Sequence, residues 1–377
     1  MPMNGPSSTL RPRFTVPRKQ KRRRSWKFKL CAVLLGITVS LLMAEFAVRL
    51  LGFNDDYRSP VVSQVIPRKY GPTELLETGF VPYSCIRSTY PSNPRGYFDQ
   101  YDSIEHYFNS EGWREDEIPV EKPPGTFRIL ALGDSYLFGQ GVRPEDLFIN
   151  KLEVLLNEME PSRNVQTINT GQSGYNTWTE LQLLKKRGLD FAPDLVMLNF
   201  VPNDVEPDIF TDRPKIEFFT DYTSSYTASD WLTKRSDLWM LTKRTMAQQW
   251  RANAYLQESM RSYQTNSEKW QRCRESLLEI QTVCQAHDLP LVVVIWPFFI
   301  NLNGNYPFAA IHEQVISLCQ ASGIPVIDLK DHFGDASGPE LWVHPLDQHP
   351  NEHAHQLAAN AVAEFLHEQL KTSDTAP

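Results

Sequence analysis

A serine and a histidine of this chain have the surroundings that nucleophilic catalysis needs. Ser135 follows an apolar run in ILALGDSYLFG (129–139), so a buried strand would deliver it to the edge of a sheet. A serine hydroxyl is a poor nucleophile at neutral pH unless a base takes its proton and an acceptor orients that base. His349 is the candidate base, and Asp347, two residues earlier, is the candidate acceptor. These three residue types together predict acyl-transfer chemistry.

Two further residues could bind the negative charge that develops on a reacting carbonyl oxygen. Gly174, in NTGQSG, can present a backbone N–H with no side chain in the way, and Asn203, in VPND, can present an amide N–H. With the backbone N–H of Ser135 they would form an oxyanion hole with three donors. The alternatives are structural, a turn glycine at position 174 and a turn cap at Asn203. Asp134, just before the serine, is expected to cap a helix or bind the loop rather than do chemistry.

The segments around these residues alternate between strand and helix patterns. Apolar runs predict buried strands at 127–133, 165–171, 193–200, 289–297 and 324–329. Helical spacing predicts helices at 144–159, 176–188, 267–288, 309–323 and 351–370. This alternation predicts a parallel sheet with helices on both faces, in which ligands bind beyond the carboxyl ends of the strands. The candidate residues follow such strand ends, so we expect them to meet at one edge of the sheet.

A stretch of about sixty residues, 205–266, interrupts the alternation after the third strand. It is rich in Asp, Thr, Trp and Arg. An insertion of this length could form a lid or a substrate-facing subdomain, or it could be surface decoration. The sequence leaves these alternatives open.

A cluster of histidines near the C-terminus raises the question of a metal site. His349 and His353 are four residues apart, a spacing that suits shared ligation. However, a helix start at Pro350-Asn351 would turn His353 and His355 to different faces. We therefore expect neither a metal nor a cofactor. The five cysteines have no paired zinc spacing and are too scattered for a disulfide framework, although one bridge remains open.

The N-terminal part of the chain has a different composition from the rest. Residues 1–29 hold ten Lys or Arg and no acid, which predicts a basic cytoplasmic tail; the remaining residues carry a formal charge of −17, which argues against a nucleic-acid partner. The apolar run 30–51 is long enough to span a bilayer, and its basic flank predicts a cytoplasmic N-terminus. A cleaved signal peptide is the alternative, but the region before the run is long and LMAEFA is a poor cleavage site. Residues 52–125 then predict an extracytoplasmic stem.

The four polar stretches resemble the conserved blocks of the SGNH hydrolases, also called GDSL-like esterases and lipases. GDSYLFGQGV, NTGQSGYNT, VPND and DQHPN are similar to the first, second, third and fifth blocks. The resemblance covers about 127–370, and 107–130 looks like what precedes the first block in membrane-anchored bacterial members. It implies a flavodoxin-like α/β/α domain over 126–371, with a five-stranded parallel sheet in the order 2-1-3-4-5. It also implies a Ser135–His349–Asp347 triad and an oxyanion hole of Ser135, Gly174 and Asn203.

Two positions depart from the pattern of this family. Val201-Pro202 stand where the third block usually opens with glycine, and Asp347 is one residue closer to the histidine than is usual. The resemblance implies a membrane-anchored, periplasmic serine esterase that hydrolyses an acetyl or short-chain acyl ester of a carbohydrate or lipid without a cofactor. The alternatives are an O-acyltransferase that uses the same triad on a polysaccharide, and a non-catalytic glycan-binding or assembly protein. An acetylated glycan product, rather than free acetate, would distinguish the transferase.

Overall fold

The computed structural model of the chain describes residues 25–57, 59, 61–67, 82–207 and 231–374. The chain divides into two compact units, Met1–Gly52 and Phe53–Pro377. In the first unit, helix α1 (Trp26–Leu50) is capped by Ser25, whose hydroxyl accepts from the Phe28 N–H. Its mean hydropathy reaches 2.2 over 18 residues, so it is long and apolar enough to cross a membrane. The tail predicted over 1–29 lies mostly outside the described residues.

Five parallel strands form the central sheet of the second unit. They are β4 (Thr126–Gly133), β5 (Asn164–Asn169), β6 (Leu195–Phe200), β7 (Leu291–Ile295) and β8 (Val326–Asp328). Their spatial order is β5-β4-β6-β7-β8, which confirms the predicted order 2-1-3-4-5. Every residue of β6 and β7 is buried, because helices cover both faces of the sheet. The continuous apolar runs of the sequence arise from this double burial.

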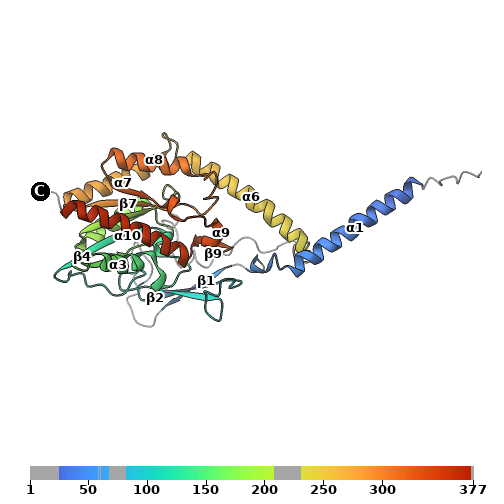
Figure 1. Ribbon diagram of the computed structural model, residues 1–377, viewed down its shortest axis with the longest axis horizontal. Helices are drawn as coiled ribbons and strands as arrows, with labels where there is room; N and C mark the ends of the chain where they lie inside the picture. Colours follow the sequence, from blue (N-terminus) through green and yellow to red (C-terminus); the bar gives the residue numbers. More distant parts are fainter. Residues whose placement is uncertain (1–24, 58, 60, 68–81, 208–230, 375–377) are drawn as a thin grey trace, which may run out of the picture. The chain divides into compact units, whose positions relative to one another are not determined.

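Helices lie on both faces of the sheet (Figure 1). Helices α3 (Phe148–Met159) and α10 (Glu352–Asp374) pack together on one face, where Ile129 and Ala131 of β4 join their core. On the other face Leu130 and Leu132 pack with α4 (Thr177–Lys186), α7 (Glu268–Ala286) and α8 (Ala309–Ala321). Successive strand residues point to opposite faces, so one strand contributes to both cores. The layers are those of a three-layer α/β/α fold.

Two of the predicted boundaries that differ from the structure lie at 3-10 turns. The helix predicted at 144–159 begins at Phe148, because Pro144–Asp146 form a separate 3-10 turn, η2. The strand predicted at 324–329 is shorter, since the Asp328 side chain accepts from the Lys330 N–H and caps another 3-10 turn, η4 (Leu329–His332). Both differences arise where a polar or proline residue ends the regular pattern.

The segment that precedes the parallel sheet forms an antiparallel sheet of its own. Its strands are β1 (Val62–Pro67), β2 (Ser84–Thr89) and β3 (Ser103–Tyr107), in that order. Ile86 of β2 and Phe108 pack on Phe138, which lies just after β4. Side-chain contacts therefore join this small sheet to the element that carries Ser135. The domain boundaries inferred from the sequence stay predictions.

The interruption predicted at 205–266 contains a long helix, α6 (Asp237–Ser262). Its first turn is tied to the start of the second unit, because Asn54 Nδ2 donates to the Asp237 carbonyl at 2.8 Å. Residues 208–230 lie outside the described residues, and the role of this stretch as lid or decoration stays a prediction. Cys273, Cys284 and Cys319 are buried free thiols, so none of them forms the bridge left open by the sequence.

Candidate active site

Two elements carry the predicted triad to the carboxyl edge of the sheet. Ser135 is the first residue of α2 (Ser135–Phe138), which follows β4 directly. Asp347 and His349 lie on β10 (Asp347–Pro350), which pairs with β9 (Trp342–His344) as a hairpin. Residues two apart on a strand share a face, so β10 can point both side chains at Ser135. The single residue between Asp347 and His349, which departs from the family pattern, is thus compatible with an extended strand.

The three side chains form a continuous hydrogen-bonded chain. Ser135 Oγ lies 2.9 Å from His349 Nε2, and His349 Nδ1 lies 2.5 Å from Asp347 Oδ1. An Nδ1–H that donates to the carboxylate leaves Nε2 as the acceptor for the serine proton. The arrangement therefore has the order nucleophile, base and orienting acid.

Two effects act on the pKa of His349 in opposite directions, and the effect of the Asp347 carboxylate is the larger. Burial penalises the imidazolium, but the charge of Asp347 and its hydrogen bond outweigh burial and raise the pKa of His349. Burial likewise disfavours the Asp347 carboxylate, yet the His349 charge, its side-chain hydrogen bond and further donors lower the pKa of Asp347. The pair thus stabilises the charge that His349 acquires when it takes a proton.

The predicted oxyanion residues lie in the two neighbouring loops. Asn203 follows β6, and its Nδ2 donates to Asp134 Oδ2 at 3.0 Å. A carboxamide nitrogen carries two hydrogens, so one N–H of Asn203 remains for a ligand. Gly174 follows β5 and has a φ of +81°, a left-handed conformation that suits glycine. Both loops follow strands adjacent to β4, the strand that leads into Ser135.

A close backbone approach brings the Gly174 loop against the serine helix. The backbone N–H of Thr170 and that of Gln172 donate to carbonyls of β4, so the pairing continues past the end of β5. A Cβ added at Gly171 would lie 2.4 Å from the Phe138 backbone nitrogen in α2. Glycine is required at this position because no side chain fits between the two backbones.

Comparison with known proteins gives the family of this chain. Residues 131–357 match the model of the GDSL-like lipase/acylhydrolase family. The chain belongs to this family. It is accordingly an ester hydrolase, as the sequence predicted. A search of curated proteins found no match.

Several solved structures of esterases are similar to this acylhydrolase at low identity. A two-domain esterase active on acetylated mannans, co-crystallised with mannopentaose, is 17% identical with a TM-score of 0.36; the match covers 64% of this chain and 49% of that one. The chain thus spans about half the length of that esterase. A putative lipolytic protein of the G-D-S-L family from Desulfitobacterium hafniense is 13% identical (TM-score 0.38; 64% and 99% covered). A catalytic mutant of an acetylxylan esterase from Geobacillus stearothermophilus is 15% identical (TM-score 0.41; 64% and 95% covered).

Asp134 of this acylhydrolase has the structural role that the sequence predicted. Its carboxylate caps α2 by accepting from the Tyr136 N–H at 2.8 Å and also accepts from Asn203. Burial raises the pKa of Asp134, although these hydrogen bonds favour its charged form. Asp134 therefore fixes the Asn203 amide beside the serine helix.

Two residues that contact the site were not found from the sequence, and both precede the family match. Tyr90 donates its hydroxyl to Asp347 Oδ2 at 2.7 Å. The buried Arg114 guanidinium donates to the carbonyls of Phe138 and Gly139, at 2.8 and 2.5 Å, and also to that of Val142. No local pattern marks such contacts; the only sequence signal is that Arg114 lies in the stretch 107–130, which resembles the segment before the first block.

The other histidines of the C-terminal cluster have separate structural partners. His355 Nδ1 accepts from the Phe148 N–H at 2.8 Å, and burial lowers the pKa of His355 to about 3. His344 lies 3.0 Å from the Ser92 hydroxyl. Among the described residues, no three His, Cys, Asp or Glu side chains are grouped so as to hold a metal ion.

Proposed function

We propose that this acylhydrolase is a serine esterase with Ser135 as nucleophile, His349 as general base and Asp347 as the acid that orients it. The hydrogen-bonded chain from Ser135 Oγ through the imidazole to Asp347 Oδ1 carries the proposal. Only a base within hydrogen-bond reach can take the serine proton, and both distances meet that condition.

The proposed reaction passes through an acyl-enzyme. Ser135 Oγ attacks the ester carbonyl carbon while His349 Nε2 takes the hydroxyl proton, and Asp347 stabilises the imidazolium. The backbone N–H groups of Ser135 and Gly174 and the free Asn203 N–H hold the oxyanion. Collapse expels the alcohol, which leaves with the proton from His349. Water then attacks the acyl carbon and gives one proton to His349. The bond to Ser135 Oγ breaks as Oγ takes that proton back from His349, and the carboxylic acid leaves.

The surroundings of Ser135 support a short acyl group on a carbohydrate or lipid. Only 8% of Ser135 is exposed, so a narrow approach favours a small acyl chain. The Tyr136 ring lies edge-on to the His349 ring, with centroids 5.8 Å apart. The ring centroids of Phe298 and Phe299 lie 6.3 and 6.1 Å from that of Tyr136. Tyr136 and Phe299 are buried in the core, whereas Phe298 is only partly buried and can pack against the apolar parts of an alcohol group.

We further propose that α1 anchors the enzyme in the cytoplasmic membrane. The helix has the length and hydropathy of a membrane span, and ten basic residues in 1–29 favour a cytoplasmic N-terminus. The hydrolase part of the chain would then lie on the periplasmic side. Its partners would be the membrane and an extracytoplasmic ester.

Covalent labelling tests the nucleophile directly. Treatment of the detergent-solubilised full-length protein with a fluorophosphonate should modify Ser135, because only an activated serine attacks the phosphorus at a useful rate. The modified residue is identified by peptide mass spectrometry. His349→Ala should abolish labelling, whereas His353→Ala, a matched change four residues away, should retain it. Labelling at another serine, or undiminished labelling of folded His349→Ala, would contradict the proposal.

The pH dependence of hydrolysis should report the raised pKa of His349. The base acts only when neutral, so kcat/KM should fall as pH drops through this pKa. Because Asp347 raises the pKa, the midpoint of the acidic limb should lie above the ordinary value of 6.5. Asp347→Asn removes the charge and should move the midpoint down. A midpoint below 6.5 in the wild-type enzyme, measured with 4-nitrophenyl acetate, would argue against the His349–Asp347 pairing.

A further inference from the structure

Both oxygens of the Asp347 carboxylate have a hydrogen-bond partner, and the two partners come from different parts of the chain. Oδ1 lies 2.5 Å from His349 Nδ1, within the proposed triad. Oδ2 accepts from the Tyr90 hydroxyl at 2.7 Å. Tyr90 comes just after β2, in the N-terminal antiparallel sheet and outside the residues that match the family. A residue from outside the hydrolase blocks thus touches the acid of the triad.

The Tyr90 side chain is held on several sides. It is only 3% exposed, and its ring stacks on Phe98 with centroids 4.2 Å apart and planes 5° from parallel. Its hydroxyl packs against the loop after α2, because a Cβ at Gly141 would lie 2.8 Å from it. Gly141 also has a φ of +74°, so the loop backbone approaches the hydroxyl where another residue would be strained. The hydroxyl therefore has little freedom to turn away from Asp347.

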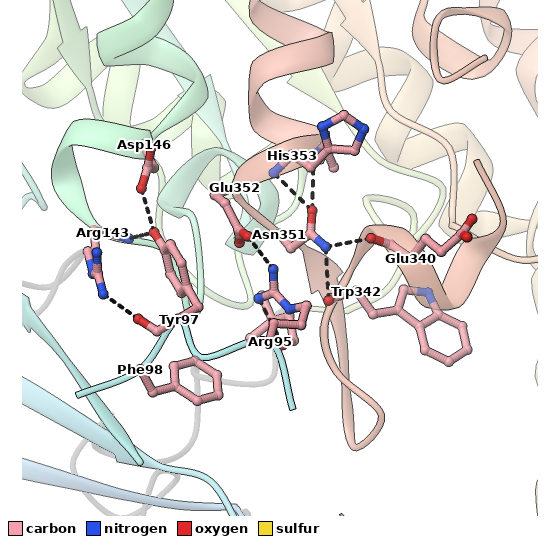
Figure 2. Close-up of polar contacts among 12 residues, drawn as sticks. Arg95, Tyr97, Phe98, Arg143, Asp146, Glu340, Trp342, Asn351, Glu352 and His353 are labelled. Carbon is pink, nitrogen blue, oxygen red and sulfur yellow. Dashed lines mark hydrogen bonds and ion pairs between the residues drawn. The ribbon is translucent and has the colours of Figure 1, made fainter. Parts of the chain in front are cut away.

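The segment after Tyr90 is fastened to the elements that surround the site (Figure 2). Arg95 pairs with Glu352 at the start of α10 and donates to the Val343 carbonyl of β9 at 3.1 Å. Tyr97 donates its hydroxyl to Asp146 at 2.9 Å. The Arg95–Val343 bond holds this segment against the β9–β10 hairpin, whose second strand carries Asp347 and His349, and the other two contacts hold it against α10 and η2. The Tyr90–Asp347 bond is thus one contact within a larger interface.

A buried carboxylate oxygen needs a donor, and the direction of that donor fixes the carboxylate plane. Without one, the oxygen loses its water without compensation, which disfavours the charged form. A hydroxyl on Oδ2 also limits rotation about the Cβ–Cγ bond, so Oδ1 stays directed at His349. We propose that Tyr90 is a positioning residue of the esterase, which holds Asp347 in the orientation that aligns His349 with Ser135. This inference rests on the proposed triad.

A double-mutant cycle distinguishes positioning through Asp347 from a general structural role. Tyr90→Phe keeps the stacked ring and removes only the hydroxyl. In the otherwise wild-type enzyme we expect kcat for 4-nitrophenyl acetate to fall about 10- to 100-fold, the loss of one hydrogen bond to a charged group, with KM unchanged. In an Asp347→Ala background the same change should alter kcat less than about twofold, since the group it orients is gone.

Tyr97→Phe provides a matched control within the same segment. It too deletes a buried hydroxyl that donates to an aspartate, but Asp146 has no contact with the triad. We expect it to retain wild-type kcat. No loss in Tyr90→Phe, or an equal loss in the two backgrounds, would overturn the positioning role. If Ser135→Ala abolishes hydrolysis in the same assay, the proposed function stands even where the Tyr90 inference fails; if Ser135→Ala is fully active, both fail.

Discussion

Ser135→Ala should lower kcat for ester hydrolysis by about 10⁴-fold or more, because it removes the proposed nucleophile of the acyl-enzyme step. Ser135 Oγ lies against His349 Nε2, and no other hydroxyl is bonded to this imidazole among the described residues. The measurement is steady-state hydrolysis of 4-nitrophenyl acetate by detergent-solubilised full-length protein, with kcat and KM determined separately. Substrate binding does not require the hydroxyl, so KM should change little.

Non-additivity identifies the two residues as one catalytic unit. His349→Ala alone should cost about as much as Ser135→Ala, and the double variant should be no slower than either, because each change already removes the activated nucleophile. Ser276→Ala, which removes a buried hydroxyl from α7, serves as the control and should keep wild-type kcat. If the fold-losses in kcat of the two single variants multiplied in the double variant, Ser135 and His349 would not act together.

The fold was predictable because its strands are buried on both faces. FRILALG and PDLVMLNF are mainly apolar, with Arg128, Asp194 and Asn199 as their only polar positions, and the structure places them as β4 and β6 at the centre of the sheet. The helices between them have one apolar face, so the alternation followed from the residues, whereas the strand order was implied by the resemblance to the family. The residues at which elements begin or end were predicted less well, as at Phe148 and Asp328. A 3-10 turn next to a helix or strand has no distinct local pattern in the sequence.

The arrangement of the candidate site was predictable only in part. Ser135 and His349 are more than two hundred residues apart, yet each lies in a recognisable stretch that a parallel sheet brings to one edge. Tyr90 has no such signal, because its contact with Asp347 spans 257 residues and depends on how the antiparallel sheet packs. The bond between Asn203 and Asp134 was likewise not predicted, since it depends on side-chain rotamers at the ends of two strands.

Arg114→Met should destabilise the fold strongly, because the guanidinium satisfies three carbonyls of the loop that follows Ser135. The side chain is only 4% exposed, and it bonds Phe138, Gly139 and Val142. Burial lowers the pKa of Arg114 to about 9, which leaves it charged at neutral pH. Methionine fills much of the same volume but donates no hydrogen bond. We expect a loss of about 3 kcal/mol in the free energy of unfolding, since the buried Phe138 and Val142 carbonyls lose the Arg114 donor, whereas the Gly139 carbonyl still accepts from the Val142 N–H.

Arg187→Met is the matched control for that loss. Arg187 pairs with Glu111, but its side chain is 43% exposed, so its removal should change the free energy of unfolding by about 1 kcal/mol at most. Urea denaturation followed by tryptophan fluorescence measures both variants. Arg114→Lys should recover only part of the loss, because an ammonium group cannot reach all three carbonyls as the planar guanidinium does. Equal effects of the two methionine variants would show that the carbonyls after α2 do not depend on Arg114, and the loop would then be held by Gly139 and its own backbone bonds.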